Sequence, residues 1–306
     1  MKIALDFLII AVCVAGLWIG AEWVVRSATH IARRLGLPEL IIGLTVIAIG
    51  TSAPEFAVTA VAAIEGRSDI SVGNVVGSNI FNLGFILGGL ALFNTIKTSK
   101  TLVRREGSML IGTTLLLAIF LRDLNLSRLE GSILMLILAS YIIYLISRRE
   151  ATEEEIPEGE FSWQDIPRLI TGLLILVASG HFLVETASDL ARLFGVSEWV
   201  IGVTIVAMGT SAPEVATSLI ALVRGKHAMS AGNLIGSDLF NLLGVLGLAA
   251  VIHPMVVDSS AIGSVLLLSG MVILVVIMMR TGRRLSRGEG ALLIGINLVR
   301  WIADFT

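Results

Sequence analysis

Charge is scarce in this chain of 306 residues. Lys, Arg, Asp and Glu make up 15% of it, whereas soluble proteins carry about 25%. That is too little to cover a soluble fold of this length, so a soluble enzyme is excluded, and the 55% hydrophobic content excludes a disordered protein. A net charge of −2 provides no basic surface for nucleic acid. The one cysteine, Cys13, cannot form an internal disulfide, which excludes a disulfide scaffold.

Apolar runs recur along the whole chain instead. A helix needs about 20 apolar residues to cross a bilayer, and the alternation typical of a β-barrel is absent from the sequence. The first run, from Leu5 to Val25, is longer than the apolar part of a signal peptide, so we expect a membrane span there. The predicted fold is an all-α polytopic membrane protein with ten spans, at residues 5–25, 40–64, 71–95, 107–121, 130–147, 167–184, 199–223, 228–253, 262–279 and 289–304.

Basic residues are distributed unequally over the two sides that these spans define. Sixteen of the 22 Lys and Arg residues fall on the side opposite the N-terminus. Because cytoplasmic loops are enriched in Lys and Arg, this side is predicted to be cytoplasmic. The interpretation is a multi-pass protein of the inner (plasma) membrane with both termini outside.

The longest polar stretch, residues 148–166, carries six glutamates and separates two halves, 1–147 and 167–306. A charged run of this kind is typical of a solvated linker. A cation-sensing segment is the alternative. We therefore expect two five-helix halves joined by an acidic cytoplasmic linker.

The second half repeats the first. At a constant offset of 159, residues 36–91 align without gaps to residues 195–250, with 26 identities in 56 positions. Each half holds five predicted spans, and because five is odd, the second copy enters the membrane in the opposite orientation. Inverted repeats are typical of secondary transporters, which bind substrate where the repeats meet. A duplicated scaffold without transport is the alternative.

Each copy contains one acid within a predicted span. Glu55 is the only charged residue of 40–64, and Glu214 is the only one of 199–223. A charge near the middle of a bilayer costs at least about 2.5 kcal/mol unless it faces a partner or a wet cavity. The two carboxylates are therefore predicted to bind cations or protons. A protonated glutamate that is hydrogen-bonded in the core is the alternative.

Hydroxyl groups and a proline precede each acid. Thr51 and Ser52 lie four and three positions before Glu55, so all three are predicted to share one helix face. Pro54 lacks an N–H and frees the carbonyl of Gly50 for another partner. The second copy repeats the arrangement with Thr210, Ser211, Pro213 and Glu214. Carboxylate, hydroxyl and carbonyl oxygens together suit hard cations such as Ca²⁺ or Na⁺.

A polar stripe follows in the next predicted span. Asn74, Ser78 and Asn82 are spaced by four, and Asn233, Ser237 and Asn241 repeat them. We expect the stripe to supply amide and hydroxyl ligands, and interhelical hydrogen bonding is the alternative. Nearby glycines would let helices approach closely, either for packing or for function: Gly73, Gly77, Gly232 and Gly236.

These paired motifs resemble a known family. GTSAPE occurs at 50–55 and 209–214, and GNxxGS(N/D)xFN follows at 73–82 and 232–241. They are similar to the α-repeats of the calcium/cation antiporter superfamily, in particular to prokaryotic sodium/calcium exchangers, over essentially the whole chain. The resemblance implies that spans 2, 3, 7 and 8 surround the cations. It also implies that spans 1 and 6 slide or rock against this core.

The resemblance further implies which residues bind ions. Glu55 and Glu214 would be ligands that Ca²⁺ and Na⁺ share. The remaining implied ligands are Thr51 and Thr210 through their carbonyls, Ser52, Ser211, Ser78 and Ser237 through their hydroxyls, and Ala48 and Ala207 through carbonyls at outer Na⁺ sites.

The sequence departs from the family pattern at one place. Several relatives, including potassium-dependent ones, carry an aspartate where Asn241 stands. The extra acid here is Asp238, where the first copy has Asn79. On a helix, Asp238 points about 100° away from Ser237, so we expect it behind the ligands or in the vestibule, with direct ion contact as the alternative. A neutral Asn241 argues against potassium dependence and leaves proton coupling open.

The predicted function is secondary antiport that exchanges Ca²⁺ for Na⁺ by alternating access and exports Ca²⁺. The expected partners are the lipid bilayer and the two ions, bound as substrates, with no cofactor, nucleic acid or protein partner. Ca²⁺/H⁺ antiport is the nearest alternative. A cation channel would select ions with rings of glutamate, but the inverted repeat argues against it. An intramembrane enzyme would need a nucleophile–base pair or a His/Glu metal set, and the four histidines fit neither.

Overall fold

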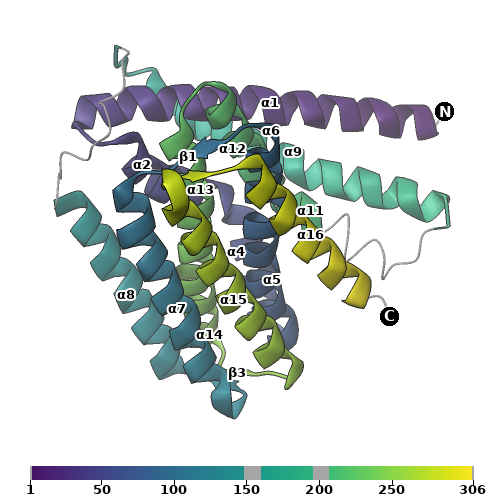
Figure 1. The fold of residues 1–306 in the computed structure, drawn as a ribbon. Coiled ribbons are helices and arrows are strands. Elements are labelled where there is room, and N and C mark those ends of the chain that lie inside the picture. Colours follow the sequence, from purple (N-terminus) through teal and green to yellow (C-terminus); the bar gives the residue numbers. More distant parts are fainter. Residues whose placement is uncertain (1, 148–159, 196–206, 305–306) are drawn as a thin grey trace.

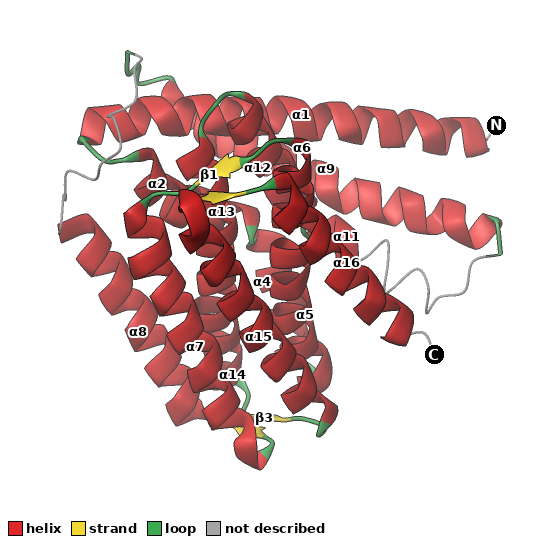
Figure 2. Ribbon diagram, viewed as in Figure 1, coloured by secondary structure: helices red, strands yellow, loops and turns green. Residues whose placement is uncertain are grey.

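A computed structural model describes residues 2–147, 160–195 and 207–304 of the chain. Helices make up almost all of these residues (Figure 2). The first half contains α1 (Lys2–Leu35), α2 (Glu39–Ile42), the π-helical segment η1 (Gly43–Ile47), α3 (Ala48–Thr51), α4 (Ala53–Ile64), α5 (Ser68–Phe81), the π-helical segment η2 (Asn82–Leu87), α6 (Gly88–Phe93), the π-helical segment η3 (Leu102–Glu106), α7 (Gly107–Phe120), the 3₁₀ turn η4 (Leu121–Asp123) and α8 (Arg128–Ser147).

The second half follows a matching order. It contains α9 (Asp165–Leu193), α11 (Ala207–Thr210), α12 (Ala212–Val223), α13 (His227–Phe240), the π-helical segment η6 (Asn241–Val245), α14 (Leu246–Ile252), α15 (Ser260–Arg280), the 3₁₀ turn η7 (Thr281–Arg283) and α16 (Arg287–Asp304). Most of the acidic linker and the first part of the predicted span 199–223 lie outside the described residues.

Six helices of the described chain are long and apolar enough to cross a membrane. A seventh span results if the bent pair Glu39–Thr51 and Ala53–Ile64 is counted as one. The first span is longer than its apolar window, because α1 continues as a helix through Arg26 to Leu35. At 1.5 Å per residue its 34 residues reach about 51 Å. In Figure 1, α1 and α9 lie across the bundle that α7, α8 and α15 form with the remaining helices.

The expected all-α fold needs one small correction, because the ends of the bundle carry two short strand pairs. Strand β1 (Ile96–Lys97) pairs antiparallel with β4 (Arg284–Leu285), and β2 (Asn125–Leu126) pairs with β3 (Met255–Val256). Extended backbone between two helices cannot form helical hydrogen bonds, and pairing with another such segment satisfies its N–H and C=O groups. The repeat offset of 159 relates β1 to β3, and Figure 1 shows these two strands at opposite ends of the bundle.

Equivalent helix ends use the same chemistry in both halves. Ser127 and Glu130 form a capping box at the start of α8, in which Glu130 Oε2 accepts the Ser127 N–H at 2.8 Å. Ser286 repeats this at 2.7 Å before α16, with Glu289 in the role of the acid. The likeness of the halves therefore extends beyond residues 36–91.

Apolar packing divides into two regions. The larger core lies among α5, α7, α13, α14 and α15, and the smaller one lies where α1 meets α9 and α12. Glycines bring α1 and α9 into backbone contact, since a Cβ on Gly20 would lie 2.9 Å from the carbonyl oxygen of Gly172. The buried polar residues described next lie on α3, α4, α5, α12 and α13, on η2 and η6, and at the breaks before α4 and α12.

Candidate cation-binding site

The two acids occupy the same position on equivalent helices. Glu55 lies in the first turn of α4 and Glu214 in the first turn of α12, and both are fully buried. A helix N-terminus carries partial positive charge, which favours a carboxylate there. The local fold therefore holds both acids in place before any ion binds.

A helix break precedes each acid. Helix α3 ends at Thr51 and α4 begins at Ala53, with a 50° bend between the two helical segments. Ser52 has φ −79° and ψ 11° at the break, and Ser211 repeats it with φ −88° and ψ 9°. Pro54 is in the first turn of α4, where its missing N–H costs nothing. The expectation of one continuous helix face for Thr51, Ser52 and Glu55 is therefore wrong.

The serines at the breaks reach across to the other half of the chain. Ser52 Oγ donates to Glu214 Oε1 at 3.0 Å, and Ser211 Oγ donates to Glu55 Oε1 at 3.0 Å. The bend turns each hydroxyl away from the acid of its own helix. Each half therefore completes the carboxylate site of the other half, which a search along one helix could not reveal.

The other oxygen of each carboxylate has no donor. Oε2 of Glu55 and Oε2 of Glu214 are buried and accept no hydrogen bond from the described part of the chain. Buried polar atoms without partners are rare, and a buried negative charge needs a counter-charge. These two oxygens therefore fit a cation or a proton as their partner.

Hydroxyls from α13 and α3 extend the cluster around Glu214. Ser237 Oγ donates to Glu214 Oε1 at 3.3 Å. Thr51 Oγ1 donates to Asn233 Oδ1 at 3.3 Å and lies 3.5 Å from Ser237 Oγ. The structure thus brings Thr51 and Ser237 to the acid of the second half.

The offset of 159 relates Thr51 to Thr210 and Ser237 to Ser78. Ser78 is buried at the α5 position that corresponds to Ser237. Thr210 is half-buried at the end of α11. Ala207, the first residue of α11, adjoins residues outside the described part. The Ala48 carbonyl already accepts the Ser52 N–H at 3.1 Å, and the Thr51 hydroxyl lies 3.4 Å from the same carbonyl oxygen.

The first asparagine of each stripe joins two helices. Asn74 Nδ2 donates to Thr59 Oγ1 at 2.9 Å, and Asn233 Nδ2 donates to Ser218 Oγ at 2.9 Å. Asn74 and Asn233 therefore form interhelical hydrogen bonds, which was the alternative to the expectation that the stripe supplies ligands. Sequence reasoning did not single out Thr59 and Ser218, although the offset of 159 relates them and both are hydroxyl residues.

The last asparagine of each stripe stands where the helix becomes a π-helix. Asn82 begins η2 and Asn241 begins η6. Wide π turns are frequent at functional sites. Both Oδ1 atoms are buried, and neither accepts a hydrogen bond from the described residues. Two further buried acceptor oxygens therefore have no donor in the described part of the chain.

Asp238 belongs to this polar network and does not lie in a vestibule, so that part of the expectation is wrong. Its side chain is fully buried, Oδ1 accepts from Asn82 Nδ2 at 3.0 Å, and Oδ2 has no donor among the described residues. Asn241 Nδ2 donates to Asn79 Oδ1 at 3.2 Å in the equivalent bond. The helical wheel of α13 could not reveal this, because the partner of Asp238 comes from the other half.

Close helix approach is visible at two of the four glycines. A Cβ on Gly236 would lie 2.6 Å from the Cα of Leu44, and one on Gly232 would lie 3.0 Å from Leu40. Gly73 and Gly77 have no described atom within 4 Å of such a Cβ. Their repeat-related contacts would be with residues 199 and 203, which lie outside the described part.

The described residues contain no group of three or more His, Cys, Asp or Glu that could hold a metal ion. The candidate ligand atoms of this cluster are instead the carboxylate oxygens of Glu55 and Glu214, with hydroxyl and amide oxygens around them. Oxygen-rich sets of this kind suit Na⁺ and Ca²⁺ and not the softer transition metals.

The fold defines a polytopic helical membrane protein, and comparison with known proteins identifies its family. The family described as sodium/calcium exchanger protein matches residues 5–147 and 166–299. The chain belongs to the sodium/calcium exchanger family, a family of membrane cation antiporters and not of enzymes.

Individual relatives cover nearly the whole chain. The inner membrane protein YrbG of Escherichia coli is 33% identical, over 92% of this chain and 91% of its own length. The sodium/calcium exchanger MaX1 of Methanosarcina acetivorans is 31% identical, over 95% of this chain and 96% of its own. A structure of the sodium-calcium exchanger NCX_Mj matches with a TM-score of 0.87 and 27% identity, over all of both chains.

Proposed function

We propose that this protein is a secondary antiporter that exchanges Ca²⁺ for Na⁺ by alternating access and exports Ca²⁺ from the cytoplasm. The observation that supports this most directly is the crossed pair of bonds, Ser52 to Glu214 and Ser211 to Glu55. It joins the two halves at a buried cluster in which both carboxylates keep one oxygen without a donor. The names of MaX1 and NCX_Mj, both sodium/calcium exchangers, support the choice of ions.

The proposed architecture is ten spans in two inverted halves, 1–147 and 167–306, joined by the acidic linker 148–166. Support comes from the strand pairs, because β1 and β3 are related by the repeat offset and lie at opposite ends of the bundle. The equivalent capping boxes before α8 and α16 support the same relation. The excess of Lys and Arg supports an inner-membrane orientation with both termini outside.

The proposed ligand set is that of the sequence analysis. Glu55 and Glu214 serve both ions, and hydroxyl, amide and carbonyl oxygens complete the coordination. The contributors are Thr51, Thr210, Ser52, Ser211, Ser78, Ser237, Asn82, Asn241, Ala48 and Ala207. Asp238 adds a third carboxylate, because its buried Oδ2 has no other partner in the described chain.

Ca²⁺ uptake into proteoliposomes tests this proposal, with the Na⁺ and pH gradients imposed separately. We expect an outward Na⁺ gradient to drive uptake at equal pH, and a pH gradient alone to have little effect. Uptake driven only by the pH gradient would establish Ca²⁺/H⁺ antiport instead. Ca²⁺ flux that needs neither gradient would establish a channel.

A further inference from the structure

A polar cavity separate from the carboxylate cluster lies on the side of α1 that faces the end of α12 and the start of α13. Its volume is about 330 Å³. The polar lining residues are Glu22, Arg26, Thr29, His30, Arg224 and Lys226. It lies away from Glu55 and Glu214, at the end of the spans where Lys and Arg are concentrated, so the proposed exchange does not use it.

One cationic side chain of this cavity has no acidic partner among the described residues. Arg224 is paired with Glu22, to which its Nε donates at 3.1 Å, and Lys226 Nζ lies 2.6 Å from Glu39 Oε1. Arg26 forms no ion pair within the described part of the chain. The fourth basic residue of the lining, His30, has its Nδ1 3.1 Å from Asp165 Oδ2. Arg26 is therefore the cationic side chain of the lining without a counter-charge, and it stands beside the low dielectric of the membrane, where attraction for an anion is strong.

The backbone adds to this attraction. Lys226 is the N-cap residue of α13, a helix of 14 residues, and its side chain forms no capping hydrogen bond. The first N–H groups of a helix and its dipole favour an anion at this end. A phosphate group in the cavity would thus meet guanidinium, ammonium and helix-terminal N–H donors together.

The surroundings indicate a lipid as the source of the phosphate. Ile19 and Trp23 are exposed on α1 and precede Arg26 by seven and three positions, so the three form one stripe on the helix. An acyl chain can lie along the apolar part of this stripe while the headgroup reaches the cavity. Basic pockets between transmembrane helices on the cytoplasmic side are known to suit anionic headgroups.

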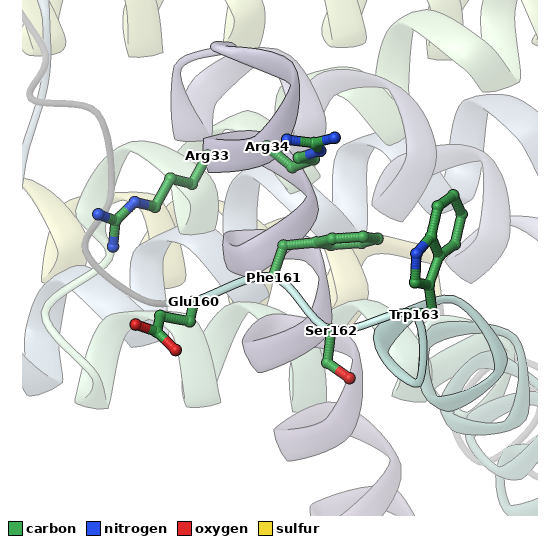
Figure 3. Close-up of a pocket in the computed structure, with 6 residues that line it drawn as sticks. All are labelled: Arg33, Arg34, Glu160, Phe161, Ser162 and Trp163. Carbon is green, nitrogen blue, oxygen red and sulfur yellow. The ribbon is translucent and has the colours of Figure 1, made fainter.

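A larger cavity of about 720 Å³ at the end of α1 provides a comparison (Figure 3). Arg33 and Arg34 contribute to it, but Figure 3 shows their guanidinium groups pointing apart, with Glu160 on the Arg33 side and the Phe161 ring below Arg34. These arginines do not converge on one position. Arg34, in the larger cavity, therefore serves as a matched control for Arg26 on the same helix.

We propose that the cavity between α1 and α13 binds the phosphate of an anionic phospholipid, with Arg26, Arg224 and Lys226 as its contacts. The bound headgroup bridges α1 to α12 and α13, the helices that carry Glu214 and Ser237. The site goes beyond the proposed exchange, and only its cytoplasmic location rests on the proposed orientation.

Native mass spectrometry of the full-length protein tests the proposal, with phosphatidylglycerol and phosphatidylcholine titrated against the unaltered chain. We expect phosphatidylglycerol to bind at least about tenfold more tightly. Arg26→Gln is expected to remove about tenfold of that affinity, the loss typical of one charge-assisted hydrogen bond. Arg34→Gln removes the same charge from the same helix and is expected to leave the affinity unchanged, while Arg26→Lys retains most of it.

Three results would overturn the proposal. The first is equal affinity of the unaltered protein for phosphatidylglycerol and phosphatidylcholine. This comparison does not depend on whether a variant folds. The second is an equal loss of phosphatidylglycerol affinity in Arg26→Gln and Arg34→Gln, which would show that the lipid responds to the general surface charge and not to this cavity. Displacement of the lipid by an equal concentration of glycerol 3-phosphate or inorganic phosphate would assign the cavity to a soluble phosphate.

Discussion

At the scale of single residues, the site is made of contacts in which one half of the chain completes the other. Glu55 and Glu214 each have one oxygen bound by a serine from the other half and one oxygen without a donor. An ion at the free oxygens would therefore be held by both halves at once.

Removing either negative charge is expected to abolish transport. Glu55→Gln or Glu214→Gln leaves a divalent ion with half of its counter-charge in a dry site, which is strongly unfavourable. We expect Ca²⁺ uptake to fall at least about a hundredfold, with normal insertion and folding. Glu185→Gln, at an exposed position of α9, is the matched control. Near-normal uptake in either buried variant would remove these acids from the mechanism.

Ser52 and Ser211 are expected to contribute equally to the apparent Ca²⁺ affinity. Ser52→Ala and Ser211→Ala each remove one hydrogen bond of 3.0 Å to a carboxylate. We expect each to weaken the apparent Ca²⁺ affinity about tenfold, because hydrogen bonds to charged groups contribute about 1.5–3 kcal/mol. Ser132→Ala, at a half-buried site on α8 where the hydroxyl bonds only the Arg128 carbonyl of the same helix among the described residues, is the control. Unequal losses in the initial rate of Ca²⁺ uptake would show that the two halves are not equivalent at the site.

Acid is expected to inhibit exchange. Protons compete with cations for the same two carboxylates, so inhibition grows as the pH falls and is relieved by raising Ca²⁺. The measurement is Ca²⁺ uptake between about pH 8 and about pH 5.5, at low and at saturating Ca²⁺. Uptake that stays flat over this range at low Ca²⁺ would contradict a two-carboxylate site that is open to protons.

At the scale of helices, much of the arrangement was predictable from the sequence. The apolar windows locate a helix in the described part of each predicted span, and the repeat relates their positions. The break at Ser52 and the contact between Asp238 and Asn82 were not predictable, because each depends on a tertiary bend or on a partner about 160 positions away. Helical periodicity describes one helix at a time, whereas this site lies between helices.

The close approach of α13 to η1 leads to a prediction of its own. A Cβ at Gly236 would lie 2.6 Å from the Cα of Leu44, so Gly236→Ala must push the helices apart. We expect a lower melting temperature and slower Ca²⁺ uptake. Gly112→Ala is the control, because nothing described lies within 4 Å of its Cβ and alanine stabilises a helix by about 0.5–1 kcal/mol relative to glycine. Equal melting temperatures for the two variants would contradict the close packing.

At the scale of the whole molecule, charge balance decides how exchange responds to voltage. Two carboxylates are neutralised by one Ca²⁺, by two Na⁺ or by two protons. A third Na⁺ would be an excess charge in a low-dielectric site, where such a charge is costly. The sequence alone therefore predicts weakly electrogenic exchange, or a third Na⁺ that binds only at high concentration, because Asn241 is neutral. The burial of Asp238 alters this balance, since Asp238 is a third buried carboxyl group and its Oδ2 has no donor among the described residues.

We therefore expect Asp238 to provide the charge for a third Na⁺, so that exchange is electrogenic and Asp238→Asn makes it nearly voltage-independent. One net charge per cycle amounts to about 2.3 kcal/mol per 100 mV. The measurement is Na⁺-driven Ca²⁺ flux in vesicles held at different membrane potentials, together with the steepness of its Na⁺ dependence. Asn241→Asp in the Asp238→Asn background is expected to restore both the voltage dependence and the steepness of the Na⁺ dependence. The single variant Asn241→Asp is expected to raise the Na⁺ affinity. A steep voltage dependence that survives Asp238→Asn would show that neutral oxygens alone hold the third ion.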